Sequence, residues 1–100
     1  MDRPQFILFI EPARAEMPEA PTEQEIRFVG EHFNYLKGQL EAGNVVLVGR
    51  TQEPPFTGIA IFEAEDIEAA RRFAENDPAI GAGVFKLIRV QPYKVALMRT

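Results

Sequence analysis

One histidine and one aspartate are the residues of this 100-residue sequence best suited to acid–base chemistry. His32 is the single side chain that titrates near neutral pH without perturbation. Asp77 stands directly before Pro78. An aspartate bonded to one imidazole nitrogen fixes the tautomer of the ring and raises the basicity of the other nitrogen. We therefore predict that His32 and Asp77 form a catalytic pair that exchanges a proton with a substrate.

Each of these two residues also has a simpler interpretation. A histidine at the edge of a buried helix face can hydrogen-bond a carbonyl group and fill space. The sequence Asn76-Asp77-Pro78 is also typical of a turn that ends a helix. Both alternatives stay open from the sequence alone.

Three further residues are candidates for substrate binding. Arg50 follows Gly49 at the end of an apolar run, where a guanidinium can hold a carboxylate or a phenolate. A solvated arginine in a turn also fits this position. Phe28 and Tyr35 lie about one helical turn before and after His32, so we expect them beside the same ligand.

The composition excludes several classes of protein. The sequence has no cysteine, which rules out disulfides, thiolate nucleophiles and cysteine-based metal sites, and we expect no metal and no cofactor. Eleven basic residues stand against fifteen acidic ones, which argues against a nucleic-acid partner. No stretch approaches the roughly 20 apolar residues that cross a bilayer, so we expect no membrane partner. The absence of cysteine favours a cytoplasmic location.

Hydrophobic periodicity and turn residues define the elements that must position these side chains. Thr22 and Glu25 make a capping box, which predicts where the first helix begins. The first expected elements are a strand over 5–11, an exposed loop over 12–21 and a helix from Thr22 to the stop at Gly43. A hairpin of strands over 45–50 and 58–63, a helix over 66–76 and a strand over 84–97 follow. Pro92 marks a bulge or an edge position in the last strand.

The two predicted helices are expected to bring His32 and Asp77 together. Asp77 follows the second helix, where the partial negative charge of a helix C-terminus disfavours an acid, so we expect another group to hold it there. Residues on facing edges of two neighbouring helices can meet. The first helix is expected to bury one apolar stripe, formed by Ile26, Val29, Phe33, Leu36 and Leu40.

This order of elements predicts an α+β fold of the ferredoxin-like βαββαβ type, in a single domain over residues 1–100. It has a four-stranded antiparallel sheet with both helices on one face. The first three strands are apolar on both sides, at 5–11, 45–48 and 59–62, so the face without helices needs a cover. The simplest cover is a second copy of the same sheet, which predicts a homodimer.

Several short motifs are spread along the chain, including the helical His32, Asn76-Asp77-Pro78-Ala79, Gly83-Val84-Phe85 and Gln91-Pro92-Tyr93. Together they resemble the motifs of the YCII-related (YciI-like) family over nearly the whole chain. The resemblance implies a dimeric α/β barrel, in which two ferredoxin-like sheets pack face to face, and it implies that His32 and Asp77 are the active-site pair proposed for that family.

These observations favour a small-molecule enzyme of the isomerase or lyase type, in which His32, oriented by Asp77, moves a proton in an apolar cleft. The loop over 12–21 leads into the helix that carries His32, so we expect this loop to border the cleft. The alternative is a non-catalytic dimeric module that binds a metabolite or a partner protein through the same cleft. The isolated histidine–aspartate pair favours the enzyme, and the lack of any further nucleophile or cofactor motif favours the module.

Overall fold

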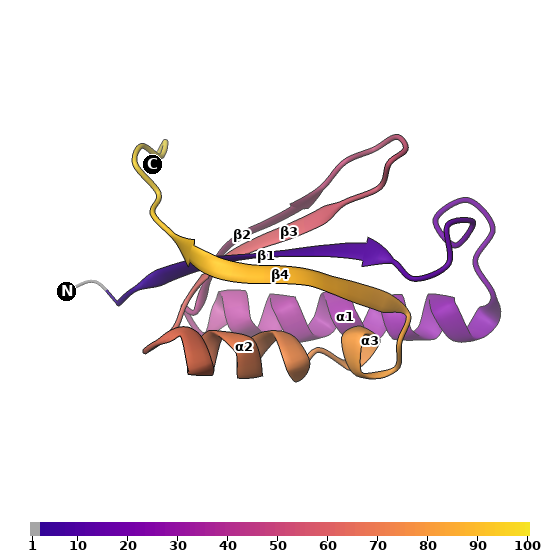
Figure 1. The fold of residues 1–100 in the computed structure, drawn as a ribbon, viewed down its shortest axis with the longest axis horizontal. Coiled ribbons are helices and arrows are strands. Elements are labelled where there is room, and N and C mark those ends of the chain that lie inside the picture. Colours follow the sequence, from indigo (N-terminus) through magenta and orange to yellow (C-terminus); the bar gives the residue numbers. More distant parts are fainter. Residues whose placement is uncertain (1–2) are drawn as a thin grey trace.

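The computed structural model describes residues 3–100 and has the predicted order of strands and long helices. None of the helices in this range is both long and apolar enough to cross a membrane. Figure 1 shows the elements, which are β1 (Gln5–Pro12), α1 (Glu23–Glu41), β2 (Val45–Arg50), β3 (Gly58–Glu63), α2 (Ile67–Glu75), α3 (Pro78–Gly81) and β4 (Phe85–Tyr93).

The four strands form one sheet in the order β2-β3-β1-β4, and every neighbouring pair is antiparallel. All helices lie on one face of this sheet, and the other face carries none (Figure 1). This is the predicted α+β ferredoxin-like fold. The prediction of Pro92 at a sheet edge is confirmed, because β4 is an outer strand, whose free side tolerates a residue without an N–H group.

The helix that carries His32 begins at the predicted capping box. The Thr22 hydroxyl accepts a hydrogen bond from the Glu25 backbone N–H at 3.1 Å, and the Glu25 carboxylate accepts one from the Thr22 N–H at 2.9 Å. The helix ends before Gly43, whose φ of 88° is a left-handed conformation that glycine adopts without a steric cost. Both ends of α1 are therefore set by local sequence.

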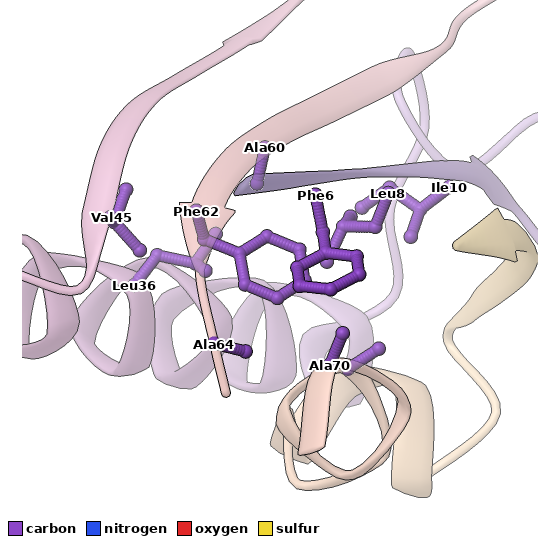
Figure 2. Packing of buried hydrophobic residues seen from close by; sticks show 10 residues of the cluster. Phe6, Leu8, Ile10, Leu36, Val45, Ala60, Phe62, Ala64 and Ala70 are labelled. Atoms are coloured by element: carbon purple, nitrogen blue, oxygen red, sulfur yellow. The ribbon is translucent and has the colours of Figure 1, made fainter. Parts of the chain in front are cut away.

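The core lies between the helices and the sheet. The ring of Phe62 is fully buried and stacks on Phe73 of α2 with 4.2 Å between the ring centroids. Figure 2 shows Phe62 beside Phe6, with the small side chain of Ala70 below them, so α2 can approach the sheet closely. The buried side chains of this cluster are Phe6, Leu8, Ile10, Leu36, Val45, Ala60, Phe62, Ala64, Ala70 and Ala74.

The prediction that α1 buries its whole apolar stripe was wrong. Leu36 is buried and lies beside Val45 at the start of β2 (Figure 2), but Ile26 and Phe33 are 58% and 64% exposed. The reason is that the β2–β3 hairpin rises away from α1 toward its tip (Figure 1), so it does not cover this part of the helix. Periodicity predicts which residues share a face, and it does not predict what packs against that face.

The last strand is shorter than expected, and a short helix precedes it. The strand ends at Tyr93 because Tyr93 pairs with Gln5, the first residue of β1, so later residues have no strand beside them. The bulge lies between Phe9 and Ile10 in the pairing of β1 with β4, and not at Pro92. The helix α3 was not predicted, and it begins immediately after Asp77.

Candidate functional site

A cleft of about 730 Å³ opens between α1 and the helix-facing side of the sheet. Its walls are mostly apolar, with Leu8 and Val48 from the sheet and Phe33 from α1. The loop over 12–21 borders it as predicted and contributes Met17, whose side chain is buried. A volume of this size is typical of a pocket for a small molecule.

His32 and Asp77 are in direct contact at the edge of this cleft. The distance between His32 Nδ1 and Asp77 Oδ2 is 2.5 Å, and the two side chains are 14% and 4% exposed. The other carboxylate oxygen, Oδ1, accepts a hydrogen bond from the Ala79 backbone N–H at 2.9 Å. The two oxygens of one buried carboxylate thus hold α1 and α3 together.

Asp77 is well placed electrostatically, contrary to the expectation from its position after α2. It is the N-cap residue of α3, and its carboxylate satisfies an N–H group that the helix itself leaves without a partner. The reasoning from an unfavourable helix C-terminus was therefore wrong. The conclusion that another group also holds Asp77 agrees with the contact to His32.

The contact with Asp77 determines which nitrogen of His32 is left free to act as a base. A carboxylate can only accept a hydrogen bond, so Nδ1 must carry the proton, and Nε2 of the neutral ring has a free lone pair. Nε2 has no hydrogen-bond partner among residues 3–100, and no buried side-chain nitrogen in this range lacks a partner, so Nε2 is accessible. The ring packs against Phe85 with 4.8 Å between the centroids, which fixes its plane.

The structure separates the three predicted substrate-binding residues. Arg50 lines the cleft. Phe28 lines a different, smaller cavity of about 300 Å³, and the Arg27 guanidinium lies 5.0 Å above its ring. Tyr35 does not line the cleft, and its hydroxyl donates a hydrogen bond to the Phe73 carbonyl oxygen at 2.7 Å.

Tyr35 links α1 to α2 close to the histidine–aspartate pair. Burial of the phenol, together with the nearby charge of Asp77, raises the pKa of Tyr35 to about 12 from its ordinary value of 10.0. Both causes disfavour the phenolate, so the hydroxyl stays protonated and remains a donor. Tyr35 thus supports the helix pairing on which the contact between His32 and Asp77 depends.

The loop over 12–21 is attached to the start of α1 by a charged network. Arg14 donates hydrogen bonds to both carboxylate oxygens of Glu25, at 3.0 and 2.7 Å, and a third to the Ala20 carbonyl oxygen at 2.7 Å. The hydrogen bonds from Arg14, followed by that from the Thr22 backbone, lower the pKa of Glu25 to about 2. Glu25 therefore completes the capping box of α1 and also anchors the loop that carries Met17 into the cleft.

Sequence reasoning missed two residues at this site, Met17 and Phe85. Met17 is the one large flexible apolar side chain in a loop otherwise made of proline, alanine and charged residues, and that contrast was the available signal. Phe85 begins a strand in which apolar and polar residues do not alternate regularly, so the sequence did not distinguish a core position from a site position. Residues 3–100 contain no group of three or more His, Cys, Asp or Glu side chains suited to a metal ion.

Fold and site together define a two-layer α+β protein, one sheet covered by helices, with a histidine–aspartate pair beside an apolar cleft. A family model described as YCII-related domain matches residues 5–94, so the chain belongs to the YCII-related family. A search of curated proteins found no match.

One solved structure with the same fold is 5-chloro-2-hydroxyhydroquinone dehydrochlorinase (TftG) from Burkholderia phenoliruptrix AC1100, in complex with 2,5-dihydroxybenzoquinone. The two chains are 21% identical and superpose with a TM-score of 0.70 over 90% of this chain and 93% of the other. At this level of identity the similarity establishes the shared fold.

We expect the substitution Asp77→Asn to invert the tautomer of His32. The side-chain oxygen of asparagine can still cap α3, but its amide nitrogen then faces Nδ1 and donates to it, which moves the ring proton to Nε2. Nitrogen-15 NMR measures this directly, because the chain has a single histidine and the ring signals need no further assignment. The same spectrum in Asp66→Asn, which alters the N-cap residue of α2, serves as the control. A proton on Nε2 in the unmodified protein would contradict the assignment.

We expect alkaline pH to weaken the fold through Tyr35. The folded-state pKa of about 12 lies above the ordinary value of 10.0, so the contribution to stability is complete below pH 10 and is lost as the pH rises toward 12. In Tyr35→Phe this loss is absent. Urea unfolding of both proteins between these pH values measures the difference, and parallel curves would contradict the assignment.

Proposed function

We propose that this chain is a small-molecule enzyme of the isomerase or lyase type, in which His32 transfers a proton within the cleft. The single observation that carries this proposal is the contact between Asp77 and His32 Nδ1, which leaves Nε2 as an accessible base. Asp77 orients the ring and stabilises the imidazolium that forms when Nε2 takes a proton. The apolar walls strengthen that electrostatic interaction, because they lower the local dielectric.

The chemistry needs only proton transfers through one base, and no external oxidant or reductant. Nε2 removes a proton from a carbon atom next to a carbonyl group, and the electron pair of the broken C–H bond forms an enolate. In an isomerisation the imidazolium returns the proton to a different carbon. In an elimination the electron pair expels a leaving group instead, and the proton departs to water. The same base serves both outcomes, so the substrate decides between them.

The structural relative supports the lyase-type outcome. That protein is a dehydrochlorinase, and loss of hydrogen chloride is an elimination in which a base must accept a proton. At 21% identity the similarity establishes the fold and not the reaction. The reaction of this chain is therefore proposed from its own residues. Absence of cysteine keeps the cytoplasm as the predicted location.

We further propose that the enzyme is a homodimer joined through the helix-free face of the sheet. Ile7 and Ile61 pair at the centre of this face and are buried by their neighbours. Leu47, Ile88 and Tyr93 remain exposed among the strands. Leu47 lies on β2 and the other two on β4, the two edge strands of the sheet. Apolar side chains exposed at both edges of one face favour a protein interface, and a second copy offers a matching surface.

For any compound that the protein turns over, with 5-chloro-2-hydroxyhydroquinone as the first to test, we expect His32→Ala to lower kcat by about 10²- to 10⁴-fold. The reason is the loss of the base that accepts the proton. Lys37→Ala, an exposed position on the same helix, is the matched control and should leave kcat unchanged. Unchanged turnover in a folded His32→Ala protein would reject the proposal, and the cleft would then be a binding site without this chemistry.

We expect Leu47→Asp to raise the dimer dissociation constant by about a hundredfold or more, because it buries an unpaired carboxylate in the interface. Leu40→Asp is the control, since Leu40 lies on α1 and is 49% exposed, against 41% for Leu47. Phe9 is a poorer choice, because the Arg89 guanidinium lies 3.9 Å above its ring and would pair with a carboxylate placed there. Sedimentation equilibrium measures the association. A monomeric wild-type protein at micromolar concentration would remove the basis for this interface.

A further inference from the structure

The charges around the cleft differ from those of the chain as a whole. The sequence has a net charge of −4, yet none of the side chains that line the cleft is an aspartate or a glutamate. Arg50 is the one permanently charged residue of the lining, and His32 is the other titratable one. The cleft is thus a mostly apolar surface with a single cation.

Arg50 also has no partner of its own within the described part of the chain. The Arg3, Arg14 and Arg27 side chains each bind a side chain or a carbonyl oxygen nearby, whereas the Arg50 guanidinium makes no hydrogen bond or ion pair with residues 3–100. A guanidinium without a carboxylate partner, at the edge of an apolar cavity, is suited to bind a planar anion with two parallel hydrogen bonds.

The sheet register directs Arg50 toward the cleft. Arg50 is paired with Gly58, two positions after Val48 is paired with Ala60, so the Arg50 and Val48 side chains lie on the same face of β2. Gly58 has no side chain to fill the space opposite Arg50. A Cβ atom there would lie 3.1 Å from the Ile10 side chain, so the position opposite Arg50 stays small.

Arg50 and His32 stand at opposite sides of the cleft. Arg50 is on β2, while the His32 ring packs on Phe85 of β4, and β3 and β1 lie between these two strands. With neighbouring strands about 4.8 Å apart, the backbones of β2 and β4 are separated by about 14 Å. The Arg50 side chain covers part of this separation, and a ligand that contacts both groups must bridge the rest, which favours an elongated molecule over a compact one.

We propose that the cleft binds elongated, apolar monoanions, in which one carboxylate is held by Arg50 and the hydrocarbon or aromatic body lies along the apolar walls toward His32. The substrates of the proposed enzyme then include members of this class, with the reacting carbon at the end far from the carboxylate. That last step rests on the proposed function, whereas the binding of the anion does not.

Octanoate and octanol are a matched pair of probes, because they share the hydrocarbon chain and differ in the charged group. Each is titrated into the protein while the ring signals of the single histidine report binding inside the cleft. We expect octanoate to bind about tenfold more tightly than octanol, in keeping with a charge-assisted hydrogen bond at a partly exposed site. We expect Arg50→Gln to abolish this preference by weakening octanoate binding alone, and Arg50→Lys to restore it in part. Arg72→Gln, at an exposed arginine of α2, should change neither affinity.

Three results would overturn the proposal: equal affinity for the two probes in the wild-type protein, a preference that survives in Arg50→Gln, or no saturable change in the His32 signals with octanoate. These outcomes are distinct from failure of the proposed function. If octanoate binding depends on Arg50 but no turnover depends on His32, the ligand class stands and the enzyme proposal fails. If turnover depends on His32 but is indifferent to Arg50, the enzyme proposal stands and the ligand class fails.

Discussion

The hydrogen bond between the buried Asp77 carboxylate and His32 is the interaction on which the site and the helix layer both depend. A buried carboxylate is costly unless charged or polar partners satisfy it. In this protein the partners come from two elements, because Oδ2 contacts the His32 ring on α1 and Oδ1 accepts from the backbone of α3. Removal of either partner would leave part of the charge buried without compensation. The arrangement of α1 against α3 and the tautomer of His32 are thus fixed by the same atoms.

The helix α3 explains how a carboxylate can be held with this accuracy. Pro78 supplies the first residue of α3, where the missing N–H group costs nothing, and Asp77 caps the turn from outside. The carboxylate is therefore oriented by the local backbone before it meets the histidine. Tyr35 adds a second tie between the helices through its hydrogen bond to the Phe73 carbonyl, one turn of α2 before Asp77. Local geometry and a tertiary hydrogen bond support the same contact.

Features with a local physical cause were predictable from the sequence, and features that depend on packing were not. The capping box of Thr22, the stop at Gly43 and the hairpin position were predicted because each is set by a few neighbouring residues. The pairing of His32 with Asp77 was expected from residue type and helix order, but its geometry depends on α3, a single turn too short for periodicity to reveal. The exposure of Phe33 was missed because it depends on the direction of the distant β2–β3 hairpin.

The exposed apolar residues of α1 are best understood as part of the site and not as a failure of packing. Ile26 and Phe33 repeat the spacing of core residues, yet they line the cleft in which Val48 and Phe85 form the opposite wall. Apolar surface left in water costs roughly 25 cal/mol per Å², so an open cleft of this kind lowers the stability of the empty protein. The same surface favours an apolar ligand, because binding removes it from water. One helix of this small domain therefore serves two purposes. Leu36 completes the core, and Phe33, about one turn away, forms part of the wall of the cleft.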